Sequence, residues 1–418
     1  MTAEDGFERR DGELWAESVP LREIAGRFGT PCYVYSRAAI EARWARYRAA
    51  MGDRGSVCYA VKANGSLALL GLLAEHGAGF DIVSGGELAR VLRAGGDPGR
   101  VVFSGVGKGV EEIRRALGAG IRCFNVESAA ELERLAAIAR EAHTPAPVAI
   151  RINPDVEAPT HRYIATGQAE SKFGVPLEEA RALYRRAAAE PALRVRGLAF
   201  HIGSQLMSVA PLEAAAERAA ALVRELQAEG IAIEHIDAGG GLGVRYTRES
   251  PPAPSEHVEA VAGPLAGLGA ELIVEPGRAL VAEAGLLLTR VEYLKQGGAR
   301  TFAVVDAGMN DYLRPALYGA EHAVEAVAPG EAAERRLDIV GPVCESADVF
   351  ATDRPLPAAA GDLLAVRSAG AYGAAMASQY NGRPRPPEVL VDGAHTHLIR
   401  RRESAEDLMR GERLLPGS

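Results

Sequence analysis

A lysine interrupts an apolar, strand-like run near residue 60. The stretch CYAVKANGS covers residues 58–66, with Lys62 near its centre and a break at Asn64-Gly65. Burying an ammonium group costs free energy unless a partner or a covalent bond compensates it. We therefore expect Lys62 to be a buried lysine that is held covalently, as an amine attached to a carbonyl compound.

Two further stretches carry groups that could bind an anion and a cation. HIDAGGGLG (235–243) contains Gly240 and Gly241, and glycine allows backbone N–H groups to approach an anion closely. Alone this is a weak signal, because glycine runs are common in turns, and GGGLG lacks the spacing of a dinucleotide fingerprint. The second stretch places a carboxylate and a guanidinium together, in Glu275-Pro276-Gly277-Arg278. An isolated pair of this kind would be a local ion pair.

A single ligand explains the lysine, the glycines and the acid–arginine loop. Pyridoxal 5′-phosphate (PLP) needs a lysine for attachment, a phosphate-binding loop and a partner for its ring nitrogen. We predict that Lys62 provides the attachment, that Gly240, Gly241 and Arg278 hold the phosphate, and that Glu275 keeps the ring nitrogen protonated.

The HIGSQ stretch supplies two more candidates. His201 could stack on the cofactor ring and Ser204 could reach the phosphate, although a single histidine near a strand end is more often structural. His201 is therefore a candidate for both the catalytic and the cofactor-binding set.

The secondary-structure elements that must position these residues alternate regularly along the chain. Short apolar runs end in Gly, Asn, Ser or Pro, and stretches with Leu, Ile or Val at helical spacing lie between them. The runs are VCYAVKAN (57–64), GFDIVS (79–84), VVFSGVG (101–107), CFNVES (123–128), VAIRINP (148–154), GLAFHIGSQ (197–205), HIDAGGG (235–241) and ELIVEPG (271–277). Eight such repeats predict an α/β fold with a closed, TIM-like (β/α)8 barrel, with a doubly wound open sheet as the alternative. The barrel is favoured because the candidate residues fall at the C-terminal ends of the runs, where barrel active sites lie.

After about residue 285 the rhythm changes to strands at shorter spacing with turn clusters between them. This pattern is typical of an antiparallel β domain. We expect an N-terminal segment (1–34) that packs with the β domain, a PLP-binding (β/α)8 barrel (35–285) and a C-terminal β domain (286–418).

Composition narrows the class of protein. The 418 residues are 48% hydrophobic and carry a net charge of −8 without a dense basic block, so we expect no nucleic-acid partner. No apolar run approaches the ~20 residues that span a bilayer, so no membrane partner is expected. Four scattered cysteines without a CxxC pair predict neither a disulfide framework nor a metal site. The acidic start MTAEDGFERRDGE does not fit a secretory signal, so we expect a cytoplasmic protein.

A series of longer motifs runs along the chain, namely YAVKAN, FDIVSGGEL, FSGVGK, FNVES, RINPD, ESKFG, HIGSQ, GGGLGVRY, EPGR, VDAGMNDYLRPALY, GPVCESAD and SAGAYG. In these motifs the chain resembles the diaminopimelate decarboxylases, which belong to the alanine-racemase-like (fold type III) group of PLP enzymes, and the resemblance extends from about residue 20 to about residue 400. The resemblance implies a PLP-binding barrel with a β domain. It also implies decarboxylation of meso-diaminopimelate to L-lysine, the last step of lysine biosynthesis.

The resemblance adds residues that spacing could not identify. It implies that Lys62 carries the cofactor and that the loop Glu275 to Arg278 binds it. It implies substrate contacts by Arg278, Arg314, Tyr318, Glu345 and Tyr372, with Tyr372 also touching PLP. Arg314 offers a bidentate match to the distal carboxylate of the substrate, and Glu345 can pair with an ammonium.

The resemblance also implies a shared active site. Cys344 is the candidate proton donor, although a free cysteine is more often a small buried residue. Cys344 and Glu345 are expected to reach the active site of a partner subunit, which would make the enzyme a homodimer with shared active sites.

Three alternatives remain open. Ornithine, arginine and lysine decarboxylases share the lysine, the histidine strand, the glycines and EPGR, but their substrates would give Arg314 no carboxylate partner. A paralogous decarboxylase with a pathway-specific substrate is harder to exclude, whereas CESAD and LRPALY argue against alanine racemase. A non-catalytic PLP-binding protein is disfavoured by the presence of Lys62, Cys344 and a full β domain.

Overall fold

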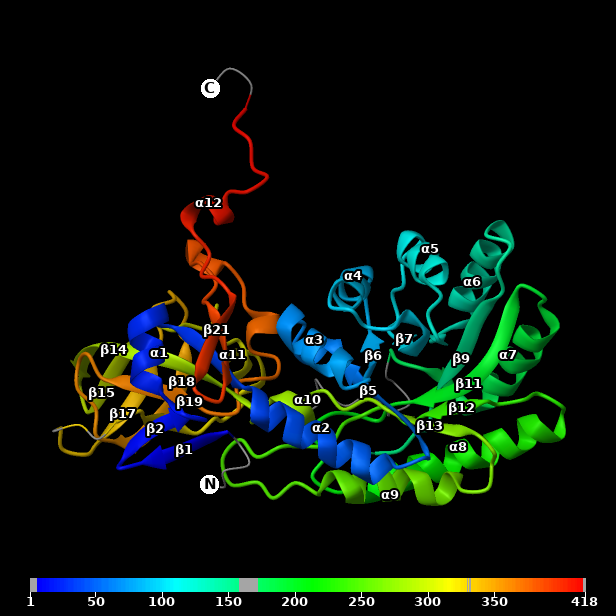
Figure 1. Ribbon diagram of the computed structural model, residues 1–418, viewed down its shortest axis with the longest axis horizontal. Coiled ribbons are helices and arrows are strands. Elements are labelled where there is room, and N and C mark those ends of the chain that lie inside the picture. The colour runs from blue at the N-terminus through cyan, green and yellow to red at the C-terminus, as the bar shows by residue number, and fades with distance from the viewer. Residues whose placement is uncertain (1–5, 158–171, 329, 331, 416–418) are drawn as a thin grey trace. The chain divides into compact units, whose positions relative to one another are not determined.

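Eight parallel strands close into a barrel in the computed structural model, which describes residues 6–157, 172–328, 330 and 332–415 (Figure 1). The start of the chain through residue 5, and the first two residues of the ESKFG motif, lie outside the described residues. The chain forms two compact units. The barrel unit comprises residues 43–244 and 249–280, and the β unit comprises residues 1–42, 245–248 and 281–418.

The barrel strands coincide with the eight predicted runs. They are β5 (Gly55–Ala60), β6 (Gly79–Ile82), β7 (Val101–Phe103), β8 (Cys123–Val126), β9 (Ala146–Asn153), β11 (Leu193–Phe200), β12 (His235–Asp237) and β13 (Glu271–Val274). Each strand pairs in parallel with its neighbour, and two pairings, β8 with β9 and β13 with β5, complete the circle. This closure confirms the barrel and excludes the open doubly wound sheet. A short strand, β10 (Val175–Pro176), adds to β9 outside the circle.

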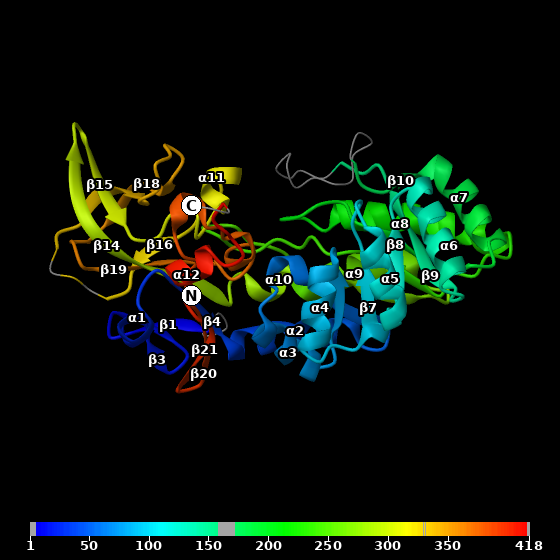
Figure 2. The same cartoon turned by 90° about the horizontal axis from the view of Figure 1, so that it is seen from above.

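One helix precedes the first barrel strand, and a helix follows each of the eight barrel strands along the chain. They are α2 (Arg37–Met51), α3 (Leu67–Glu75), α4 (Gly85–Arg93), α5 (Val110–Ala119), α6 (Ala129–Glu141), α7 (Leu177–Ala189), α8 (Ala210–Ala228), α9 (Pro254–Leu265) and the short α10 (Arg278–Val281). Figures 1 and 2 show α3 to α7 succeeding one another around the strands. The first turns are fixed by side-chain caps at α4 and α6, where Ser84 accepts from the Glu87 N–H and Ser128 from the Glu131 N–H.

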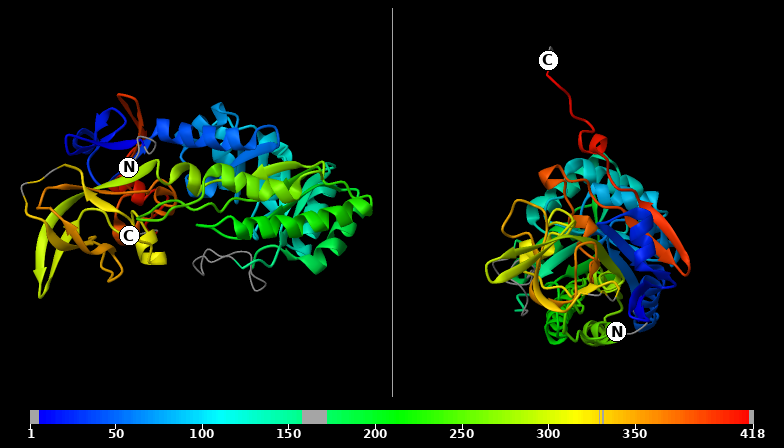
Figure 3. Two further views of the ribbon diagram at one scale, coloured as in Figure 1. Left: turned by 90° about the horizontal axis from the view of Figure 1, so that it is seen from below. Right: turned by 90° about the vertical axis from the view of Figure 1, so that its left-hand side faces the viewer.

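The β unit contains a large sheet that combines both ends of the chain. Its strands are β4 (Cys32–Ser36), β14 (Gly285–Gly297), β15 (Arg300–Val305), β16 (Val324–Ala326), β17 (Arg335–Val340), β18 (Val349–Leu356), β19 (Leu363–Val366), β20 (Glu388–Asp392) and β21 (His395–Arg400). The N-terminal strand β4 lies between β14 and β20, and both views of Figure 3 show blue N-terminal ribbon next to red C-terminal ribbon in this unit. The expected β-rich domain with an N-terminal strand is therefore confirmed. Most pairs are antiparallel, but β4–β20 and β15–β17 are parallel.

Smaller elements complete the β unit. A three-stranded sheet is formed by β1 (Phe7–Arg10), β2 (Glu13–Ala16) and β3 (Val19–Pro20), and the helix α1 (Leu21–Phe28) follows it. Two short helices belong to the C-terminal part of the unit: α11 (Arg314–Tyr318) follows β15, and α12 (Ala405–Leu408) follows β21. One core of this unit combines side chains of β2, α1, β4, β14 and β20. Among the described residues, no helix has both the length and the apolar character needed to cross a membrane.

Candidate active site

Lys62 lies just beyond the C-terminal end of β5. The strand ends at Ala60, and residues Val61–Ala63 form a single 3₁₀ turn in which Val61 and Ala63 are buried. The Lys62 side chain itself is 37% exposed, and its Nζ lies 2.7 Å from Oδ2 of the fully buried Asp81. Because Ala60 pairs in register with Asp81, the two parallel strands bring the lysine and the carboxylate together. The expectation of a buried lysine is therefore corrected: the side chain is partly exposed, and a carboxylate compensates its charge.

His201 follows β11 directly and contacts the triple glycine. Its Nδ1 accepts a hydrogen bond from the Gly240 N–H at 3.2 Å, so the ring proton lies on Nε2. Burial lowers the pKa of His201 well below its ordinary value, and the charges of Arg151 and Lys62 lower it further. A neutral imidazole in this position can stack on a flat ring without adding a charge.

The glycines leave room for close backbone approaches. A Cβ on Gly240 would lie 2.2 Å from the Glu275 carbonyl oxygen, so a side chain at this position would collide with the loop after β13. Gly241 has a φ of +103°, and a Cβ on it would lie 2.5 Å from the Gly203 carbonyl oxygen. Arg278 donates to the Ser204 hydroxyl at 2.8 Å, which joins the loop after β13 to the loop after β11. A buried guanidinium, a hydroxyl and glycine backbone together fit a phosphate group.

The loop after β13 packs against the lysine turn. The Ala60 N–H donates to the Pro276 carbonyl at 3.3 Å, and a Cβ on Gly277 would lie 3.0 Å from the Ala60 Cβ. Glycine at 277 therefore allows the loop that carries Glu275 to lie directly beside the turn that carries Lys62.

Three carboxyl groups are buried inside the barrel near Lys62. Asp81, Asp237 and Glu275 are 0%, 1% and 7% exposed. Burial raises the pKa of Glu275 well above its ordinary range, and the charges of Asp237 and Asp81 raise it further. Within the described part of the chain, Oε1 of Glu275 has no hydrogen-bond partner. A buried carboxyl oxygen that lacks a partner fits the ring nitrogen of PLP, and with Lys62 and the phosphate-binding groups the barrel residues fit this cofactor.

Arg314 occupies an aromatic environment in the β unit. It begins α11, is 6% exposed, and its guanidinium carbon lies 4.7 Å from the ring centre of Tyr246 and 5.6 Å from that of Tyr318. Among the residues that the structure describes, Nε of Arg314 has no hydrogen-bond partner. Tyr246 also packs edge-on against His322, with ring centres 4.6 Å apart. A buried guanidinium that contacts two aromatic rings and keeps an N–H donor without a described partner can bind an anionic ligand.

Cys344 and Glu345 lie in the loop between β17 and β18. Cys344 is exposed, and its N–H donates to Oδ1 of Asn381 at 3.3 Å. The adjacent Glu345 accepts from the Tyr380 hydroxyl at 2.5 Å. Two consecutive loop residues are thus held by Tyr380 and Asn381, two consecutive residues of the QYNG segment (379–382). Asp348 fixes the other end of the loop, because its carboxylate accepts hydrogen bonds from the N–H groups of Val343 and Met309.

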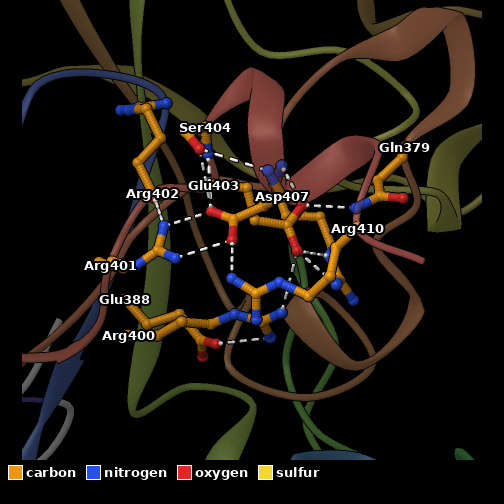
Figure 4. A network of polar contacts seen from close by, with 10 residues as sticks. Gln379, Glu388, Arg400, Arg401, Arg402, Glu403, Ser404, Asp407 and Arg410 are labelled. Carbon is orange, nitrogen blue, oxygen red and sulfur yellow. Dashed lines mark hydrogen bonds and ion pairs between the residues drawn. The ribbon is translucent and has the colours of Figure 1, made fainter. Parts of the chain in front are cut away.

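The QYNG segment is itself fixed by a polar network (Figure 4). Gln379 donates to Glu403 at 2.9 Å, and Glu403 also accepts from Arg385. Burial raises the pKa of Glu403, but the hydrogen bonds from Arg385 and Gln379 outweigh it and lower the pKa to about 2. The network therefore stays charged at neutral pH and supports the segment that contacts Cys344 and Glu345.

Tyr372 adopts a backbone conformation that is uncommon for a residue with a side chain. Its φ is +56°, in the left-handed region. Backbone of this kind clusters at functional sites, where the surrounding structure maintains it. This observation supports a functional role for Tyr372.

The predicted site residues fall into two sets. The barrel unit brings together Lys62, His201, Ser204, Gly240, Gly241, Glu275, Pro276, Gly277 and Arg278, and the β unit holds Arg314, Tyr318, Cys344, Glu345 and Tyr372. No role was predicted from the sequence for five further residues next to these sets, namely Asp81, Asp237, Tyr246, Tyr380 and Asn381. Asp81 and Asp237 could have been suspected, since each is a carboxylate at the C-terminal end of a barrel strand.

Comparison with known proteins gives a consistent result along the whole chain. A family model described as "Pyridoxal-dependent decarboxylase, pyridoxal binding domain" matches residues 37–282. A diaminopimelate decarboxylase of Pseudomonas aeruginosa is 57% identical over 413 residues, which cover 99% of this chain and 100% of the relative. The crystal structure of the Helicobacter pylori diaminopimelate decarboxylase complexed with L-lysine is similar, with a TM-score of 0.91 and 43% identity, and the match covers 93% of this chain and 98% of that one. The M. jannaschii enzyme in co-complex with L-lysine gives a TM-score of 0.94 at 38% identity and covers 100% and 99%.

Proposed function

Because this chain belongs to the diaminopimelate decarboxylase family of pyridoxal-dependent decarboxylases, we propose that it converts meso-2,6-diaminopimelate to L-lysine and CO2. The observation that carries the substrate assignment is Arg314. Its guanidinium is buried between two tyrosines, and its Nε has no hydrogen-bond partner among the described residues. Diaminopimelate has a second carboxylate that can fill this position, whereas ornithine, arginine and lysine do not.

The barrel residues would hold the cofactor. Lys62 provides the attachment, Ser204, Arg278 and the backbone of Gly240 and Gly241 bind the phosphate, and Glu275 faces the ring nitrogen. When bound, PLP supplies a ring that accepts the electron pair left behind by the departing CO2. The neutral His201 supports the face of the ring, and Pro276 and Gly277 hold the Glu275 loop beside the Lys62 turn.

The β-unit residues would bind the substrate and complete the reaction. Arg314 and Tyr318 bind the distal carboxylate, Glu345 pairs with the distal ammonium, and Tyr372 contacts both substrate and cofactor. Cys344 donates the proton that replaces CO2 at the reacting carbon. Lys62 would also move protons during the reaction, with Asp81 as the carboxylate beside its amine.

We test this function by offering the PLP-loaded protein meso-diaminopimelate, L-ornithine, L-arginine and L-lysine in parallel, with CO2 and the amine product recorded. Formation of lysine from meso-diaminopimelate alone is the expected result. Turnover of one of the basic amino acids would contradict the substrate while keeping the family. A lack of turnover on all four would point to a pathway-specific substrate or to a binding role.

We further propose that the enzyme is a homodimer in which Cys344 and Glu345 act in the partner subunit's site. The exposure of Cys344 supports this, since a catalytic thiol must be reachable. Mixing inactive Lys62→Ala and Cys344→Ala proteins should restore activity through hybrid dimers with one intact site. Proven subunit exchange without recovery would contradict the shared site. A cytoplasmic location, and a division of labour between segments 1–34, 35–285 and 286–418, are further proposals of this assignment.

A further inference from the structure

A buried acid pair lies at the bottom of the proposed cofactor site. Asp237 ends β12 and pairs in register with Ile273 of β13, and Glu275 lies two residues further along the same chain direction. Side chains two residues apart on a strand share a face, so Glu275 is a diagonal neighbour of Asp237. Both side chains are buried, and the charge of Asp237 adds to burial in raising the pKa of Glu275. Two neighbouring carboxyl groups buried in this way do not both ionise, because their like charges repel each other, so the pair holds a proton.

The contacts of Asp237 show which partner carries that proton. Oδ2 of Asp237 accepts from Nδ2 of Asn125 at 2.9 Å, and Oδ1 accepts from the Gly239 N–H at 3.0 Å. Both oxygens therefore receive N–H donors, as expected for an ionised carboxylate. Asn125 is itself fixed, because its Nδ2 also contacts the Ser104 hydroxyl at 3.1 Å. The proton of the pair consequently lies on Glu275, whose Oε1 stays available.

The other ionisable groups around the pair agree with this assignment. Lys62 forms an ion pair with Asp81, and its charge lowers the pKa of Glu275 less than burial and the charges of Asp237 and Asp81 raise it. Burial raises the pKa of the Cys58 and Cys123 thiols, and the charge of Asp237 raises it further, so both thiols stay neutral. Burial also raises the pKa of Asp237, but the hydrogen bonds from the Gly239 N–H and Asn125 oppose this increase.

We propose that Asp237 is a positioning residue for the cofactor: it holds a proton on Glu275 before PLP binds and directs Oε1 of Glu275 toward the ring nitrogen. This inference rests on the proposed function. On binding, the O–H bond of Glu275 breaks and an N–H bond forms, so one proton is distributed over Asp237, Glu275 and the ring nitrogen. Where the nitrogen already carries a proton, Glu275 releases its own to solvent. With two ionised carboxylates nearby, the remaining proton is held on the nitrogen, which is the form that accepts electrons best.

Infrared difference spectroscopy of the full chain tests this inference without relying on turnover. The band of a protonated carboxyl is recorded for the PLP-free protein at neutral pH and after addition of PLP. Glu87 and Asp311, whose pKa burial raises to about 7, also contribute to this region. Their bands remain in Glu275→Gln, so the difference between wild type and this variant isolates Glu275. We expect the Glu275 band before PLP is added and its loss afterwards.

Two variants probe Asp237 with opposite signs. Asp237→Asn removes the neighbouring charge, so the pH midpoint at which Glu275 ionises should fall by roughly 1 to 3 units. Asn125→Ala removes a donor to Asp237, makes that carboxylate hold the shared proton more strongly, and should raise the midpoint of the pair. Circular dichroism establishes that each variant is folded.

The outcomes separate this inference from the proposed function. Absence of a Glu275 band in the PLP-free wild type, or an unchanged midpoint in folded Asp237→Asn, would overturn the role of Asp237. If PLP binds, as visible absorbance reports, and the Glu275 band persists, the inference also fails while the cofactor assignment stands. If PLP does not bind at all, the proposed function fails, whereas the midpoints of the PLP-free proteins still decide the role of Asp237.

Discussion

Replacing Arg314 by methionine should separate substrate recognition from stability. The methionine side chain keeps most of the packing between Tyr246 and Tyr318 but removes the guanidinium that lies 4.7 and 5.6 Å from their ring centres. A charge-assisted contact to a carboxylate contributes about 1.5–3 kcal/mol. Its loss should lower kcat/KM for meso-diaminopimelate by roughly 10- to 150-fold, at about 1.4 kcal/mol for each factor of ten.

The same substitution should leave the fold at least as stable. A cation–π contact contributes about 0.5–2 kcal/mol, whereas burying a charge without an ionic partner costs several kcal/mol. The second effect is larger, so the free energy of unfolding of Arg314→Met should equal or exceed that of the wild type. Denaturant titration measures this quantity on the same preparations that are used for kinetics.

A matched control is available in the same unit. Arg336 forms an exposed ion pair with Asp353, and its side chain is 66% exposed. Arg336→Met should therefore leave kcat/KM unchanged. The reasoning is refuted if folded Arg314→Met keeps kcat/KM within twofold of the wild type, or if Arg336→Met loses as much activity.

Three further results are expected. Lys62→Ala should lose both activity and the visible absorbance of attached PLP. The control variant Lys295→Ala, on the exposed part of β14, should retain both. Absorbance spectra measure the attached PLP, and a CO2 assay measures the activity. Ser204→Ala, which removes the hydroxyl held by Arg278 at 2.8 Å, should weaken PLP binding about fivefold for a loss of about 1 kcal/mol, as measured by fluorescence titration, and unchanged affinity would contradict a phosphate contact. Burial lowers the pKa of His257 to about 4, so the unfolded state binds a proton first as pH falls below 6.5 and stability is lost between pH 6.5 and 4. The wild type should accordingly lose about 3 kcal/mol more of unfolding free energy than His257→Gln between pH 7 and pH 4 in urea titrations, and equal losses would show that His257 is not the cause.

The strand pattern allowed the barrel to be predicted because each strand is a local feature. An apolar run that ends in a glycine or polar residue is visible within ten residues, and eight of them in order leave few possible topologies. Lys62 could be identified for the same reason, since a cation at the end of such a run departs from the pattern. Its exposure could not, because the turn at Val61–Ala63 that lifts it out of the strand has no distinct sequence signal.

Contacts between distant segments escaped prediction. Tyr246 follows the triple glycine, and nothing in the pattern around GVRY indicates that residues 245–248 join the β unit, where Tyr246 contacts Arg314. The contacts of Tyr380 and Asn381 with the Cys344 loop likewise join segments more than thirty residues apart. Such pairings are fixed by the folded sheet and leave no periodic trace along the chain.

The position of β4 between β14 and β20 determines when this strand can find its partners during synthesis. The hydroxyl of Tyr35 in β4 donates to Glu388 in β20, which is 353 residues later in the chain. At about 5–20 residues per second, a ribosome takes roughly 20 to 70 seconds to deliver that partner. The barrel, whose strands pair mostly with their successors, can form during this interval, while the early apolar strand β4 lacks β14 at one edge until residue 285 is made and β20 at the other edge until residue 388 is made. Chaperone protection of β4 on the nascent chain would therefore govern the yield of native enzyme, and truncation before β20 would leave an aggregation-prone edge of β4 in the sheet of the β unit.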